Sequence, residues 1–203
     1  MPKDKTATNK RLQECMRREF LEKGFEKASL NHIAKQAGIT PAGVYRHYAS
    51  KEAMFESLVA AVAEEFYCIC EEQMRKIDTD VIREHVGNGY STFEEGWIDY
   101  IYRHFDEFKL LIVCSKGTKY EGFLDTLVTM EEKSSAHLIQ LLKREGFVKK
   151  SFTEEQIHIT ATMYITGLYE IIRHDMPKEK AIECIRFIYE FYDGAWKSAL
   201  EMR

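Results

Sequence analysis

The chain has 203 residues, of which 45% are apolar and 31% charged, and its formal net charge is −4. This balance is typical of a globular protein with a sizeable core and argues against a disordered chain. No window approaches the roughly 18 uninterrupted apolar residues of a membrane span, and the N-terminal segment is too charged for the core of a signal peptide. We therefore expect a soluble, cytoplasmic protein.

Charge is unevenly distributed along the chain. Residues 1–51 hold 11 Lys and Arg against 5 Asp and Glu, whereas residues 52–203 hold 18 against 28. A basic head on an acidic body indicates a polyanion partner for the head alone. Taken by itself, this pattern leaves both nucleic acid and a membrane surface open as that partner.

The basic head is predicted to form three short helices. Apolar residues recur at three- and four-residue steps over residues 9–23, which predicts an amphipathic helix that ends at the following glycine. A second helix is predicted over residues 30–37, with Ser29 as its N-cap. Thr40 is expected to cap a third helix, with a proline in its first position, that extends to about residue 48. A long fourth helix follows.

Two short helices joined by a glycine-containing turn, inside a basic segment, are the arrangement of a helix-turn-helix motif, whose second helix enters the major groove of DNA. The sequence SLNHIAKQAGITPAGVYRHYASKEAMF, residues 29–55, resembles the DNA-binding signature of the TetR/AcrR family of transcriptional regulators. The matching positions are Ile33, Ala34, Ala37, Gly38, Ile39, Tyr45, His47, Tyr48, Lys51 and Glu52.

The resemblance implies an all-α protein of about nine helices. It places a helix-turn-helix DNA-binding domain at residues 1–50 and a helical effector-binding and dimerisation domain at residues 51–203. Double-stranded DNA becomes the expected partner of the head, and no membrane partner is expected.

The residues of the motif have separate expected roles on DNA. Thr40 lies where free amide groups and the helix dipole favour a phosphate, and Pro41 offers an apolar face to a thymine methyl. Arg46 is the only long donor on the predicted recognition helix, and it either reads a guanine or holds a phosphate. Asn31 reaches a base edge or a phosphate. Ala42, whose side chain is a methyl group, and Gly43, which has no side chain, are expected to permit close approach to DNA.

The resemblance adds contacts to the DNA backbone from the remaining motif positions, which are Ser29, Tyr45, His47 and Lys51. The complete set expected at the DNA is Ser29, Asn31, Thr40, Pro41, Ala42, Gly43, Tyr45, Arg46, His47 and Lys51.

The acidic body has helical periodicity along most of its length, beginning with a long helix from residue 51 to about residue 76. A break is predicted at Asp78–Asp80, and Gly87 and Gly89 disturb the pattern again. Further helices are predicted over about residues 121–145, 154–174 and 177–201. The second of these begins with a capping box, and the third has Pro177 in its first position.

The last two predicted helices carry too many apolar residues for one buried stripe. Two apolar faces need two partners, so we expect one face to pack inside the subunit and the other to pair with a symmetry mate. The result is a homodimer through the last two helices, which the resemblance also implies. Such a dimer would present two recognition helices to a near-palindromic operator, about 34 to 36 Å apart or somewhat more.

The middle of the body is rich in aromatic and methionine side chains, most of which are expected in the core. The resemblance implies a pocket for a small-molecule effector in this region. The candidate lining residues are Trp97, Phe105, Tyr120, Phe123 and Tyr164. The acidic balance of the body favours an apolar or cationic ligand over an anionic one.

Sequence motifs of enzymes are missing from the chain. There is no GxSxG elbow, no HExxH, no paired CxxC and no dinucleotide fingerprint. Five cysteines without CxxC spacing in a cytoplasmic chain indicate reduced thiols and neither a disulfide framework nor a metal site. We therefore expect a protein that is not an enzyme and holds no cofactor and no metal.

The function that the sequence favours is a repressor. It would occupy a palindromic operator as a homodimer. A small-molecule inducer would release it by binding preferentially to a conformation in which the spacing of the two DNA-binding heads does not match the operator. The alternative is a DNA-binding protein whose C-terminal helical domain binds a protein partner. A closed apolar cavity would favour the first reading, and an exposed apolar patch over a filled core would favour the second.

Overall fold

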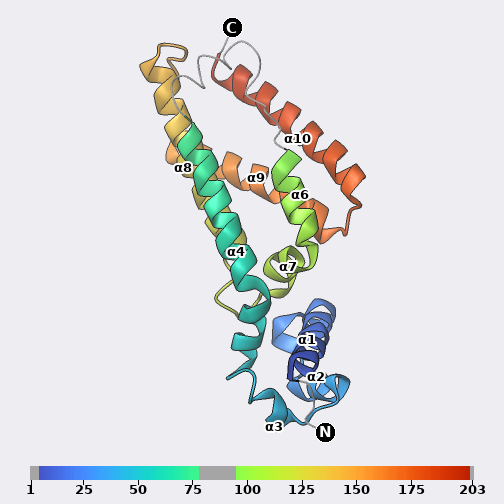
Figure 1. Ribbon diagram of the computed structural model, residues 1–203. Coiled ribbons are helices and arrows are strands. Elements are labelled where there is room, and N and C mark those ends of the chain that lie inside the picture. Colours follow the sequence, from blue (N-terminus) through green and yellow to red (C-terminus); the bar gives the residue numbers. More distant parts are fainter. Residues whose placement is uncertain (1–4, 78–94, 202–203) are drawn as a thin grey trace. The chain divides into compact units, whose positions relative to one another are not determined.

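The computed structural model describes residues 5–77 and 95–201, and this part of the chain consists of helices and loops without a β-strand (Figure 1). The predicted all-α fold is confirmed. The chain divides into two compact units. The first unit holds Met1–Glu65 and His104–Phe123, and the second unit holds Phe66–Arg103 and Leu124–Arg203. The predicted boundary after residue 50 divides the chain by function, into a DNA-binding and an effector-binding domain, and not by packing. It stays a prediction.

The first unit is built around α1 (Lys5–Lys27), α2 (Leu30–Ala37), α3 (Pro41–Val44) and the first half of α4 (Lys51–Lys76). The short helix α7 (Phe105–Lys109) and the π-helix η1 (Leu110–Cys114) complete it. Its core contains a cluster of three rings, in which Phe55 meets Phe20 and Phe25 edge to face at centroid distances of 5.3 and 5.5 Å. These contacts join α1 to the start of α4.

Local sequence signals end α2 as predicted and interrupt α1 at the predicted glycine, although α1 begins at Lys5, four residues before its predicted start. Gly24 interrupts α1 with φ 71°, a backbone angle that a residue with a side chain seldom adopts. Ser29 has extended backbone angles and accepts a hydrogen bond from the amide of His32, so it is the N-cap of α2. Gly38 then ends α2 in the left-handed conformation, with φ 66°.

Helix α3 is shorter than predicted. Thr40 caps it through the amide of Gly43, at 3.1 Å, but α-helical structure ends at Val44 instead of about residue 48. The amides of Arg46 and His47 bond three residues back, which tightens the chain into turns. Gly43, a poor helix former, lies in the middle of this short element and weakens it.

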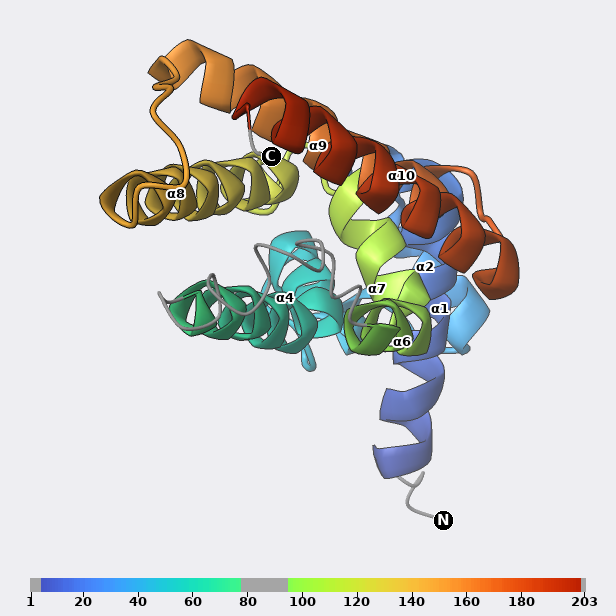
Figure 2. The same cartoon turned by 90° about the horizontal axis from the view of Figure 1, so that it is seen from above.

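The second unit contains the end of α4, α6 (Glu95–Arg103), α8 (Phe123–Arg144) beyond its first residue, α9 (Glu154–Arg173) and α10 (Lys178–Ala199). The predicted capping box between Thr153 and Gln156 begins α9. Pro177 is the N-cap of α10 and not its first helical residue, a shift of one position from the prediction. Helices α9 and α10 pack side by side (Figure 2).

Helix α6 is joined to the start of α10 by polar contacts. The Tyr102 hydroxyl donates to the Met176 carbonyl at 2.7 Å, and Lys178 pairs with Asp99 at 2.8 Å. A separate apolar core in the second unit is formed by the last turns of α8 and by residues that follow α8 and α10. It contains Ile139, Leu141, Leu142, Val148 and Leu200.

The predicted break at residues 78–80 and the disturbance at Gly87 and Gly89 lie outside the described residues. Among the helices that the structure describes, none is both long enough and apolar enough to cross a membrane.

Candidate nucleic-acid interface and ligand cavity

A buried carboxylate fixes α2 on α1. Glu19 is only 2% exposed, and its side chain accepts hydrogen bonds from the Ser29 amide at 3.0 Å and from Lys23 Nζ at 2.8 Å. Its second oxygen lies 2.5 Å from Nδ1 of His32. One acidic side chain of α1 therefore holds both the cap residue of α2 and a side chain of its first turn.

The ionisation of Glu19 reflects two opposed effects. Burial disfavours the charged form, but the hydrogen bonds from Lys23, from the Ser29 amide and from His32 outweigh burial and lower the pKa of Glu19. The carboxylate is thus the stable form at neutral pH. Sequence analysis did not single out Glu19, although its position seven residues after Leu12 puts it on the buried stripe of α1.

The residues predicted to contact DNA lie together on α2, on α3 and on the turns after α3. Most of them are exposed, and the Tyr45 ring is 54% exposed. Gly43 is partly buried, and an added Cβ would meet Thr40 Oγ1 at 3.4 Å, which is ordinary contact. The exposed members of the set are Ser29, Asn31, Thr40, Pro41, Ala42, Tyr45, Arg46 and His47.

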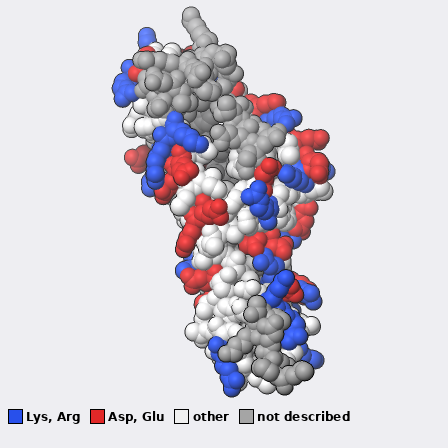
Figure 3. Space-filling model, viewed as in Figure 1, with Lys and Arg blue, Asp and Glu red and all other residues white. Residues whose placement is uncertain are grey.

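This surface lacks negative charge. Residues 28–50 include Lys35 and Arg46 but no Asp or Glu. Both basic side chains are exposed, and neither has an ion pair within the described part of the chain. In the view of Figure 3, the side chains drawn near α3 are uncharged or basic. A polyanion can approach it without meeting a carboxylate.

Lys51 differs from the other predicted DNA contacts because its ammonium group already has acceptors. Lys51 Nζ donates to the carbonyls of Phe25, Glu26 and Ala28 at 2.8, 3.2 and 3.4 Å. It also lies 4.5 Å from the centre of the Phe25 ring. Lys51 thus ties the start of α4 to the end of α1, and a phosphate contact would compete with these acceptors.

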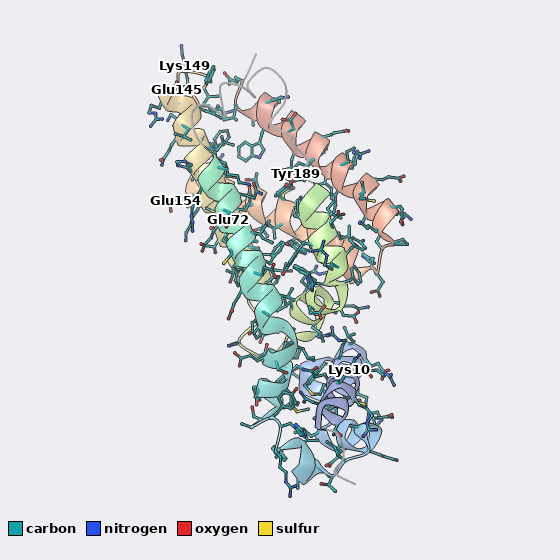
Figure 4. All side chains as sticks on the ribbon, viewed as in Figure 1. Lys10, Glu72, Glu145, Lys149, Glu154 and Tyr189 are labelled. Atoms are coloured by element: carbon teal, nitrogen blue, oxygen red, sulfur yellow. The ribbon has the colours of Figure 1, made fainter. Side chains whose placement is uncertain are left out.

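Two neighbouring cavities lie in the second unit. The larger has a volume of about 570 Å³, within the roughly 300–1,000 Å³ usual for small-molecule sites, and the smaller has about 280 Å³, just below that range. Of the predicted lining residues, Trp97 lines the larger cavity and Tyr164 lines both. Figure 4 labels two further lining residues, Glu72 on α4 and Tyr189 on α10.

The other three predicted lining residues belong to the first unit and line neither of these cavities. Phe123 is 1% exposed and packs on Phe108 at 6.3 Å, and Tyr120 lies 6.4 Å from Phe55. Phe105 begins α7. Aromatic composition alone could not separate the side chains that fill the core of one unit from those that line a cavity in the other.

Helices α9 and α10 each carry exposed apolar residues one turn apart. Ile159 and Met163 of α9 are both 57% exposed, and Phe187 and Phe191 of α10 are 67% and 59% exposed. Phe187 and Phe191 stack on one another at 6.4 Å. Phe187 and Phe191 belong to the second apolar face that the sequence predicts for the last helix, whereas Ile159 and Met163 lie outside the face predicted for α9, whose Ile165 and Ile172 are buried.

Comparison with protein families finds one match. Residues 17–58, which include the whole of α2 and α3, match the model of bacterial regulatory proteins, tetR family. The matched segment therefore contains both the Glu19 contacts and the surface that lacks acidic residues.

Solved structures with a similar fold cover nearly the whole chain. The TetR family transcriptional regulator PfmR from Thermus thermophilus has a TM-score of 0.55 and 19% identity, over 89% of this chain and 97% of that chain. A transcriptional regulator of the TerR/AcrR family from Aquifex aeolicus has a TM-score of 0.53 and 18% identity, over 90% and 99%. NalD, the secondary repressor of the MexAB-OprM multidrug efflux pump in Pseudomonas aeruginosa, has a TM-score of 0.52 and 18% identity, over 92% and 97%.

Proposed function

We propose that this chain is a regulator of the tetR family, whose model its residues 17–58 match, that it represses transcription by binding a palindromic operator as a homodimer, and that a small-molecule inducer releases it. The observation that carries the proposal is the exposed surface of α2, α3 and the following turns, on which Arg46 and Lys35 have no ion pair among the described residues and lie in a segment without acidic residues. Phosphates attract such a surface, and Arg46 is the side chain long enough to reach a base edge.

The dimer is proposed to form through α9 and α10. Four exposed apolar side chains on these two helices would lose contact with water in a symmetric interface, and burial of such side chains is the main favourable term in association. A two-fold axis repeats the recognition surface, so a dimer matches an inverted repeat. A monomer would read only one half-site.

The inducer is proposed to bind in the cavities of the second unit. A ligand shifts an equilibrium between two conformations only by its difference in affinity for them. A ligand that prefers the conformation with unsuitably spaced recognition helices would therefore lower the affinity for the operator. That NalD, a protein of the same fold, is a repressor is consistent with this direction of control.

The second candidate function retains DNA binding and replaces the small molecule by a protein partner on the second unit. The exposed pair of Phe187 and Phe191 favours it, because an apolar surface of this kind also suits a heterologous interface. Measurement of the molecular mass in solution distinguishes the two hypotheses. In a stable homodimer this face is buried between the two copies, whereas in a monomer it stays exposed and available to a different protein.

The test of the proposed function is selection of DNA from a random duplex pool by the purified full chain, followed by sequencing and by binding at two salt concentrations. We expect an enriched inverted repeat, bound by two chains. Binding that is weak, strongly salt-dependent and equal for all sequences would instead indicate a non-specific electrostatic contact, and the operator-binding function would be wrong.

A further inference from the structure

The two cavities of the second unit meet at one carboxylate. Glu131 of α8 lines both of them, together with Ile77, Tyr164 and Tyr189. Ser135 Oγ donates to Oε1 of Glu131 at 2.9 Å. The other oxygen has no partner among the described residues. An acceptor without a donor therefore faces the space that a ligand would fill.

Acidic side chains outnumber basic ones among the described residues that line the cavities. The larger cavity is lined by two carboxylates, those of Glu72 and Glu131, and by no Lys, Arg or His among the described residues. The smaller cavity has one basic side chain, Lys197, but its ammonium is already paired with Asp193 at 2.8 Å. Among the described residues, neither space offers an unpaired cation to Glu131.

Several other side chains in the wall of the larger cavity are aromatic. Trp97, Tyr164, Tyr169 and Tyr189 come from three different helices, and π faces attract cations. The indole nitrogen of Trp97 is buried and has no hydrogen-bond partner among the described residues. One oxygen of Glu131 thus lacks a donor among the described residues in the wall of this space, which suits an occupant with its own hydrogen-bond donor.

We propose that the effector of this protein is an amphipathic organic cation, whose positive charge is held by Glu131 and whose apolar body lies among the aromatic side chains of the larger cavity. This inference rests on the proposed function, since it names the chemical class of the inducer. Among the described lining residues, an anion of the same size would meet two carboxylates and no counter-charge, so this lining favours a cation over an anion.

Glu131 can change its charge near neutral pH, whereas the cysteine and the tyrosines beside it stay neutral. Burial raises the pKa of Glu131 to about 7. Burial also raises the pKa of Cys70 to about 11 and that of Tyr164 and Tyr169 well above the ordinary value, so these three stay neutral. The described titratable and charged groups that line the two cavities with Glu131 are Cys70 and Glu72 of α4, Tyr164 and Tyr169 of α9, and Tyr189, Tyr192, Asp193 and Lys197 of α10.

The test uses two ions of the same shape and opposite charge, tetraphenylphosphonium and tetraphenylborate. Their binding to the full chain without DNA is measured by equilibrium dialysis or calorimetry. The variant is Glu131→Gln, which keeps the shape of the side chain and removes its charge. The matched control is Glu132→Gln, the adjacent position on α8, whose side chain pairs with His158 and lines neither cavity.

We expect the phosphonium to bind the wild type and the Glu132→Gln variant with similar affinity, and Glu131→Gln about tenfold or more weakly. The borate should bind the wild type much more weakly than the phosphonium does. Phosphonium affinity should rise from about pH 6 to about pH 8 in the wild type, as Glu131 ionises, and should not rise in Glu131→Gln. Equal affinity of the two ions, no phosphonium binding, or full binding by Glu131→Gln would each overturn the proposal.

The same probe separates this inference from the function on which it rests. If the phosphonium binds through Glu131 but leaves operator binding unchanged, the ligand class stands and release by an inducer fails. If another compound releases the protein from DNA while the phosphonium does not bind, the inducible function stands and the cationic class is wrong.

Discussion

Oε2 of Glu19 lies 2.5 Å from Nδ1 of His32, so a carboxylate buried on α1 directly holds the first turn of the helix that precedes the recognition helix. This contact joins two residues 13 positions apart, and the Ser29 amide joins the same carboxylate from the cap of α2. The position of α2 therefore depends on a polar contact as well as on apolar packing.

Replacing Glu19 tests that dependence. Glu19→Gln should lower the free energy of unfolding by about 1–3 kcal/mol at neutral pH, because a charged acceptor of three donors is lost. Chemical denaturation measures the difference, and Glu22→Gln, an exposed position on the same helix, is the control. Since the folded pKa of Glu19 is lowered, its stabilisation is present above the unfolded pKa and is lost as pH falls through the folded pKa. The difference between wild type and variant should shrink in that acidic range, and a difference that persists there would contradict the argument.

Lys51 is predicted to act as a clamp inside the first unit. Lys51→Met removes a charged donor from three carbonyls, and it should reduce stability by about 1–3 kcal/mol. The dependence of operator affinity on salt concentration should stay unchanged. Lys35→Met, at an exposed residue of α2, is the control for loss of a positive charge. A variant of unchanged stability whose salt slope falls by about 0.9 would assign Lys51 to a phosphate instead.

Arg46 is predicted to read a base. Arg46→Ala should reduce discrimination at one position of each half-site by about 1–3 kcal/mol, because it removes the only long donor on the recognition segment. Competition with operators that differ at single base pairs measures this, and Lys35→Ala is the comparison. A uniform loss of affinity for all sequences would place Arg46 on the DNA backbone.

The apolar face of α10 is predicted to be the centre of the dimer. Phe191→Glu would bury a carboxylate next to its own symmetry copy, so the variant should sediment as a monomer and lose most of its operator affinity. Phe147→Glu, a 38% exposed aromatic outside α9 and α10, should remain a dimer. If both variants stay dimeric, the interface lies elsewhere.

Sequence reasoning succeeded where the determinants are local. The caps at Ser29 and Thr40 and the capping box at Thr153 each depend on a few adjacent residues, and all three were predicted in place. The third helix was predicted too long because the proline and cap that begin it are strong signals, whereas no comparable signal marks its end.

The cavity was harder to predict because it depends on contacts between distant segments. Trp97 and Tyr164 were predicted to line it, but Glu131 was not, since a glutamate on an amphipathic helix is ordinarily a solvated residue. Only packing of α4, α8, α9 and α10 around this side chain separates it from the other carboxylates of the acidic body. Glu19 was missed for the same reason.

Glu131 lines both cavities and has no cationic partner among the described residues. It lowers the folding stability of the ligand-free protein, because its carboxyl group is hydrated in the unfolded chain and buried in the folded one. Mutation alone would tend to replace Glu131 by an apolar residue that fills the space, since such a change favours folding and harms nothing but ligand recognition. The residue at position 131 in proteins descended from this one would therefore indicate whether the organisms that contain them are still exposed to the ligand. A leucine there would mark a lineage that no longer senses it.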